Sequence, residues 1–193
     1  MAQVVRQPCD EGIIRSQEAI SACTPSAAPW VLAATILGSS MAFIDETALP
    51  VALPAIQSGL GATAVDAQWV VASYTLFLAA MVLVGGSLGD HLGRRRMFSV
   101  GVALFAVASA ACGLSQSPEL LIAARALQGV GAALLVPNSL AIIGASFEEE
   151  RRGRAIGTWT SLTSVTLILG PVLGGYFAEN VSWRGVFFIN VPL

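Results

Sequence analysis

The chain has 193 residues, of which 55% are hydrophobic and only 11% are charged, and its mean hydropathy is +0.73. Because soluble domains carry roughly 25% charged residues, this composition excludes an ordinary soluble globular domain and indicates an all-α membrane protein with several spans. The formal net charge of −2 says little about partners, and nothing in the sequence indicates binding to nucleic acid.

The N-terminal segment mixes acidic and basic residues and contains no apolar stretch of the kind found in signal peptides. We therefore expect residues 1–28 to form a flexible cytoplasmic tail, followed by a transmembrane bundle over residues 29–193. Cys9, Cys23 and Cys112 have unrelated spacings, with His91 as their only possible companion ligand. We expect neither a disulfide framework nor a metal site.

The first apolar segment carries two acidic residues and two prolines. Its uncharged part, residues 31–44, is only about 21 Å long as a helix and is too short to cross a bilayer. Asp45 and Glu46 must then lie inside the span or at its far edge. Asp45 is either an interfacial acid or a carboxylate in a central cavity that binds a proton or a cation. Pro50 and Pro54 should kink or end this helix.

Four further apolar runs are each long enough to span a membrane, and polar turns separate them. The runs cover about residues 67–89, 97–113, 119–147 and 155–178, and a sixth apolar segment begins near residue 186. The sequence thus predicts five complete transmembrane helices and the start of a sixth. We expect the chain to be the N-terminal fragment of a longer protein.

The segment over residues 85–96 is predicted to be a polar loop that reverses the chain at a membrane surface. This loop and the loop over residues 148–154 contain six arginines, whereas the loops after spans one, three and five contain only Arg184. By the positive-inside rule, the tail and the loops over residues 90–96 and 148–154 are cytoplasmic.

The first of these loops also contains an acid among glycines. Topology explains its arginines, and Asp90 could then be an incidental surface partner of Arg94. That interpretation leaves Gly86, Gly93 and their neighbouring glycines unexplained. Glycine permits close backbone approach, so Asp90 could also meet a helix N-terminus.

The fourth span contains Arg125, followed one turn later by Gln128 and accompanied by small residues. Arg125 could extend to the membrane surface, because residues 126–147 span the bilayer without it. Alternatively, the small residues let another helix approach closely, and the buried arginine finds a partner there.

The fifth span contains several glycines and one proline that could serve packing or bending. The step from Gly170 to Gly174 supports tight helix packing, and Pro171 should bend the helix. Ordinary packing explains this pattern, but a kinked, glycine-lined helix could also lie where two bundles rock against each other.

Taken together, these residues resemble signatures of the major facilitator superfamily. The matches are Gly86, Asp90, Gly93 and Arg94 between spans two and three, Arg125 and Gln128 in span four, and Gly157, Gly170, Pro171, Gly174 and Gly175 in span five. The span-five pattern is typical of the antiporters, although Thr166 stands where a glycine is usual. The runs that start at Asp45 and Trp183 are similar to those of the fourteen-span drug:proton antiporters, with Pro50 and Gly185 as departures.

The resemblance implies the N-terminal helical bundle of a major facilitator fold. It assigns Asp45, Arg125 and Gln128 to proton coupling, Asp90 with Arg94 to a cytoplasmic latch, and the bend at Pro171 to a seal against leak.

The implied function is export of hydrophobic or cationic small molecules across a bacterial inner membrane, driven by the proton gradient and without a cofactor. Its partners are the substrate, the lipid bilayer and a missing C-terminal half. Transport of a metabolite and a non-transporting, truncated membrane protein are the alternatives. The sequence contains no cluster of catalytic residues that would indicate an enzyme.

Overall fold

The computed structural model describes residues 28–192, so the expected tail lies outside the described residues except for its last position. The described part is helical, with no strand. Its helices are α2 (Ala28–Leu60), α3 (Ala64–Leu92), α4 (Arg94–Leu114), α5 (Pro118–Ser146), α6 (Glu149–Asn180) and the short α7 (Gly185–Phe188). In this part of the chain, α2 to α6 are long and apolar enough to cross a membrane. The predicted all-α membrane architecture is confirmed.

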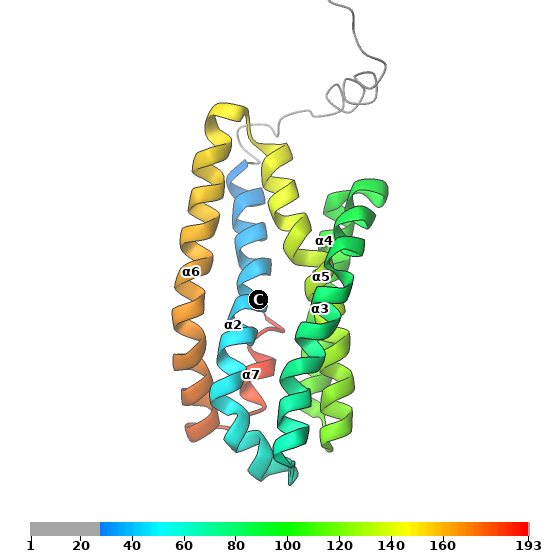
Figure 1. The fold of residues 1–193 in the computed structure, drawn as a ribbon. Coiled ribbons are helices and arrows are strands. Elements are labelled where there is room, and N and C mark those ends of the chain that lie inside the picture. The colour runs from blue at the N-terminus through cyan, green and yellow to red at the C-terminus, as the bar shows by residue number, and fades with distance from the viewer. Residues whose placement is uncertain (1–27, 193) are drawn as a thin grey trace, which may run out of the picture.

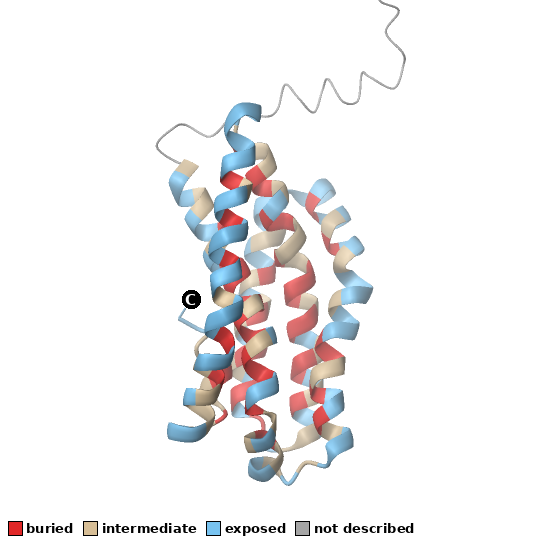
Figure 2. Cartoon of the chain, turned by 60° about the vertical axis from the view of Figure 1, so that its left-hand side comes forward, coloured by how far each residue is buried: buried red, intermediate tan, exposed pale blue. Residues whose placement is uncertain are grey.

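The long helices form an elongated bundle in which α5 joins two groups. On one side α2 lies along α6, and on the other α3 and α4 both pack on α5, which also contacts α2 (Figure 1). Buried residues follow the helix faces that point toward each other, while exposed residues cover the outer faces (Figure 2). Large apolar side chains such as Leu83 and Ile168 are exposed on the outside, as a surface in contact with lipid requires.

Helix α2 continues through both of its prolines, so of the two expected effects, a kink or an end of the helix, the structure excludes the second. A proline removes one backbone hydrogen bond, but the remaining backbone groups of a membrane helix have no water to bind and keep the helical arrangement. As a result, Asp45 lies near the middle of α2 rather than at the outer edge of a span.

The prediction of a polar loop over residues 85–96 is also wrong, because nearly all of these residues belong to helices. Helix α3 continues to Leu92 and α4 begins at Arg94, so Gly93 alone lies between them. Gly93 has φ +100°, a region that favours glycine, and its N–H donates to the Gly89 carbonyl at 3.0 Å. One residue with this backbone conformation is sufficient to separate the two helices.

The charged segment over residues 148–154 is likewise mostly helical, because α6 begins at Glu149. Two acidic residues in its first turn suit the positive end of the helix dipole. Only residues 147 and 148 separate α5 from α6. At its other end α6 reaches Asn180, which shortens the loop expected over residues 179–185.

The last segment departs from a regular sixth span. Helix α7 has four residues, and a turn follows it. The segment packs on α4, α6 and α2. Hydrogen bonds attach it to α4 and to the residue after that helix: the Ser109 hydroxyl donates to the Phe187 carbonyl at 2.9 Å, and the Arg184 guanidinium donates to the Ser115 carbonyl at 2.9 Å.

The junctions α3–α4 and α5–α6 lie at the same end of the bundle as the start of α2 (Figure 1). We call this the arginine-rich end, after six residues: Arg94, Arg95, Arg96, Arg151, Arg152 and Arg154. The junctions α2–α3, α4–α5 and α6–α7 lie at the opposite end. The alternation of arginines along the sequence therefore corresponds to a separation in space.

Candidate functional site

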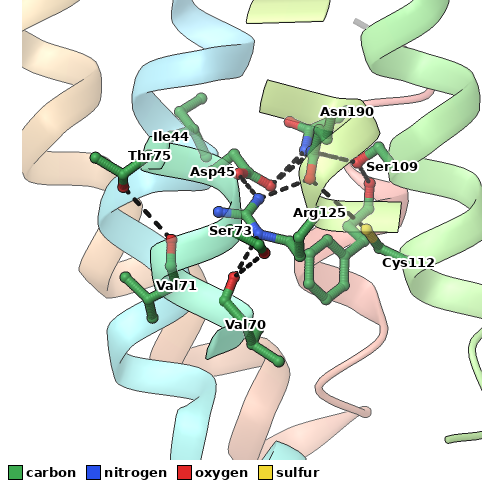
Figure 3. A network of polar contacts seen from close by, with 12 residues as sticks. Ile44, Asp45, Val70, Val71, Ser73, Thr75, Ser109, Cys112, Arg125 and Asn190 are labelled. Atoms are coloured by element: carbon green, nitrogen blue, oxygen red, sulfur yellow. Dashed lines mark hydrogen bonds and ion pairs between the residues drawn. The ribbon is translucent and has the colours of Figure 1, made fainter. Parts of the chain in front are cut away.

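A buried ion pair lies in the interior of the bundle. Asp45 of α2 is 0% exposed and Arg125 of α5 is 1% exposed, and the Arg125 guanidinium donates to Asp45 Oδ2 (Figure 3). The geometry decides both alternatives that the sequence left open, because Asp45 is not interfacial and Arg125 does not extend to the surface. A buried charge without a partner costs several kcal/mol, so each side chain requires the other.

Gln128 completes the pair from one turn along α5. Its amide nitrogen donates to Asp45 Oδ1 at 3.0 Å and to the Ser109 hydroxyl at 3.2 Å. Its amide oxygen accepts from Arg125 Nη1 at 2.6 Å. The amide therefore binds both charged groups at once and fixes their relative position.

Helix α3 contacts the Arg125 guanidinium from another side. Arg125 Nε donates to the Val70 carbonyl at 3.3 Å, and its guanidinium carbon lies 4.2 Å from the centroid of the Tyr74 ring. Gly129 makes this approach possible, because a Cβ there would meet the Tyr74 carbonyl oxygen. The small residues beside Arg125 thus serve the close helix packing that the sequence suggested.

Sequence reasoning missed three members of the network. Ser109 and Cys112 lie on one face of α4, and the Cys112 thiol donates to Gln128 Oε1 at 3.7 Å. Asn190, after α7, donates to Asp45 Oδ1 at 3.3 Å and to Ser109 Oγ at 3.0 Å. Serine and cysteine are common in apolar helices and gave no signal. Two signals could have found Asn190: it is an amide within an apolar run, and it belongs to the run from Trp183 that is similar to the drug:proton antiporters.

Glu46 lies outside this network and is exposed, as the helical rotation of about 100° per residue predicts. It lines a groove of about 290 Å³ between α2 and α3. Phe43, Tyr74 and Thr75 are among the other lining residues. Because the Tyr74 ring contacts the Arg125 guanidinium, the groove lies one side chain away from the buried ion pair.

Asp90 and Arg94 form a second polar site, at the arginine-rich end. Arg94 donates from Nε and Nη2 to Asp90 Oδ1 at 3.0 and 2.9 Å, and from Nη1 to the Ala141 carbonyl at 3.2 Å. The ion pair therefore bridges the α3–α4 junction and attaches it to α5. Asp90 contacts the side chain of the first residue of α4.

The glycines around Asp90 have different roles. A Cβ at Gly89 would collide with the Asn138 side chain of α5, and one at Gly85 would collide with the backbone of Ala133. The Asn138 amide donates to the Gly85 carbonyl at 3.1 Å. Gly86 has open space beside it, so it does not contribute to this contact.

The span-five glycines are also not equivalent. Gly170 and Gly174 face α2, where a Cβ would meet Thr47 and the Ala48 backbone respectively. A Cβ at Gly175 would make an ordinary contact with Val51 at 3.7 Å, and Gly157 has open space. Pro171 lies on the exposed side of α6.

Comparison with known proteins identifies relatives over most of the chain. The profile of the Major Facilitator Superfamily matches residues 35–193. "Multidrug resistance protein Stp" from Mycobacterium tuberculosis (strain CDC 1551 / Oshkosh) is 43% identical over 84% of this chain and 30% of its own length. The "Tetracenomycin C resistance and export protein" from Streptomyces glaucescens is 42% identical over 86% of this chain and 31% of its own length.

A solved structure shares the fold. The inward-facing, occupied crystal structure of a bacterial homologue of the human lysosomal transporter Spinster has a TM-score of 0.72 at 24% identity. The match covers 87% of this chain and 42% of that one. The chain spans about 30% of the length of the curated relatives above. With the profile matched from residue 35 onward, the chain belongs to the Major Facilitator Superfamily.

Proposed function

We propose that the chain is the N-terminal part of a proton-coupled exporter of small molecules, in which Asp45 binds and releases the transported proton. The observation that carries this proposal is the buried Asp45–Arg125 pair with Gln128 in the bundle interior. Ionisable residues inside membrane bundles commonly mark proton or substrate pathways. The names of the relatives, which refer to resistance and export, support the direction of transport.

Protonation of Asp45 would change the energy of the whole network. A neutral Asp45 no longer balances the charge of Arg125, so the closed arrangement loses much of its electrostatic stabilisation. A conformation that gives Arg125 water or another partner then becomes more favourable. Because linkage is reciprocal, a substrate that prefers one conformation changes the proton affinity of Asp45 in the same measure.

We further propose that the groove between α2 and α3 forms part of the substrate path. Its apolar walls suit hydrophobic molecules, and its aromatic side chains together with the Glu46 carboxylate suit cations. The opposing wall would come from the C-terminal part of the complete protein. The arginine-rich end would face the cytoplasm, where Asp90 and Arg94 would act as a latch and the α2–α6 packing as a seal.

The experiment that tests the proposal replaces Asp45 in the complete protein. Asp45→Asn keeps the size of the side chain but removes the titratable carboxyl. Uptake of the dye ethidium into inverted membrane vesicles, which corresponds to export from cells and is driven by an imposed pH gradient, should fall to the level of vesicles without the protein. Membrane insertion should be retained, as judged by the amount of protein in the membrane fraction.

Glu119→Gln provides a matched control, because it makes the same chemical change at an exposed carboxyl in the first turn of α5. Its efflux should stay at the wild-type rate. Undiminished pH-driven efflux by Asp45→Asn would contradict the assignment of the proton site.

A further inference from the structure

We propose that Asn190 is a positioning residue that transmits the protonation state of Asp45 to residues 185–190, a role that rests on the proposed function. Asn190 is 0% exposed and lies in the turn after α7. Among the described residues, it provides the hydrogen bond that links this segment directly to the Asp45 carboxyl group.

The hydrogen bonds around Asp45 suit its ionised form. Asp45 Oδ2 accepts from Arg125, and Asp45 Oδ1 accepts from the amide nitrogens of Gln128 and Asn190. Every described partner of the carboxyl group is therefore a donor. A protonated Asp45 would itself carry a hydrogen atom, and this arrangement presents no acceptor to it.

Asn190 holds the unused acceptor. Its Oδ1 atom is buried and has no hydrogen-bond partner, whereas its Nδ2 group donates to both Asp45 and Ser109. Leaving a buried amide oxygen without a donor is unfavourable. Rotation of the amide would let Oδ1 accept from protonated Asp45, in exchange for the two hydrogen bonds that Nδ2 now donates.

This rotation would also alter the attachment of residues 185–190 to α4. The hydrogen of the Ser109 hydroxyl is donated to the Phe187 carbonyl at 2.9 Å, so Ser109 accepts from Asn190 in the present arrangement. If Asn190 presented its oxygen to Ser109, that hydroxyl would have to donate to Asn190 and would leave Phe187. Protonation of Asp45 would thus break the hydrogen bond between Ser109 and Phe187, one of the bonds that attach the segment to α4.

Other ionisable groups near Asp45 are few. In the described part of the chain, α5 presents Arg125, α3 presents the Tyr74 phenol and α4 presents the Cys112 thiol, while α6 faces the adjacent turn of α2 with glycines. Glu46 on α2 is exposed on another face of the helix. Asp45 is therefore the carboxyl group in this network to which Asn190 donates a hydrogen bond.

Hydrogen–deuterium exchange of the complete protein tests the proposal. We expect the backbone amides of residues 185–190 to exchange about fivefold faster at about pH 5.5 than at about pH 8, after correction for intrinsic rates, as one lost hydrogen bond predicts. Asp45→Asn, which imitates the neutral acid, should show the faster exchange at both pH values. Asn190→Leu, which removes the amide, should abolish the pH dependence.

Two asparagines serve as controls. Asn180 is exposed at the end of α6, and Asn138 is buried but bonds only to the carbonyls of Gly85 and Leu134. Asn180→Leu and Asn138→Leu should both keep the wild-type pH dependence of exchange in residues 185–190. The comparison of wild type with Asp45→Asn does not require that Asn190→Leu folds.

The outcomes separate the two proposals. Equal exchange of residues 185–190 at both pH values in wild type, or wild-type pH dependence in Asn190→Leu, would overturn the role of Asn190. If Asp45→Asn nevertheless abolishes pH-driven efflux, the proposed function stands without it. If Asp45→Asn retains that efflux, the proposed function itself is wrong.

Discussion

Asp90 and Arg94 are one helical turn apart in sequence number, yet they belong to two helices separated by Gly93. Both side chains are largely exposed, at 62% and 42% respectively. Exposed ion pairs contribute about 1 kcal/mol or less to stability. Their value for folding is therefore small, and a strong effect of removing one partner would indicate a role in the transport cycle.

We predict that Asp90→Ala changes the unfolding free energy by less than about 1 kcal/mol but slows ethidium efflux several-fold. The measurements are thermal unfolding in detergent and initial rates of ethidium uptake into inverted vesicles. Glu150→Ala removes an exposed negative charge at the same end and should leave both quantities unchanged. Wild-type efflux by Asp90→Ala would show that the α3–α4 junction is a simple connection.

At the scale of the elements, helix contacts depend on where glycines meet another backbone. Gly170 and Gly174 let α6 lie against the turns of α2 that follow Asp45, Gly85 lets α3 lie against the α5 backbone, and Gly89 makes room for the Asn138 side chain of α5. Gly157 belongs to the same sequence pattern but has open space beside it. The pattern therefore contains glycines that pack closely on another helix and a glycine that contacts none.

This difference predicts opposite effects of one substitution in α6. Gly174→Ala should lower the unfolding free energy by about 1–3 kcal/mol, because its Cβ collides with the Ala48 backbone. Gly157→Ala should raise it by about 0.5–1 kcal/mol, because alanine favours the helix and meets nothing. Melting temperatures of the purified variants measure both, and equal shifts would contradict the α2–α6 contact.

For the whole molecule, the distribution of arginines gives the bundle two distinct ends. All helix junctions with several arginines lie at one end, and the junctions at the other contain only Arg184. The positive-inside rule then places the arginine-rich end in the cytoplasm. This orientation is a proposal that labelling can test.

The test uses single cysteines at exposed positions on the two ends, His91→Cys and Gln116→Cys, in a protein carrying Cys9→Ser and Cys23→Ser. Cys112 is buried and can remain. A membrane-impermeant thiol reagent added to intact cells should label the cysteine at position 116 and should label the one at position 91 only after permeabilisation. The reverse pattern would invert the proposed orientation.

The sequence by itself determined the helical membrane architecture, the number of long spans and the alternation of the two ends. These features depend on local composition, since the length of an apolar run and the charge of the next turn need no knowledge of distant residues. For the same reason the sequence could place Asp45 and Arg125 in membrane segments as candidates.

Only the tertiary structure decided how these residues are used. The pairing of Asp45 with Arg125, the placement of Ser109 and Asn190 beside them, and the exposure of Glu46 all depend on how each helix is rotated about its axis. That rotation is fixed by close contacts between backbones at positions such as Gly129 and Gly174. The helical extent of the charged segments was also missed, because helices continue beyond the apolar runs that reveal them.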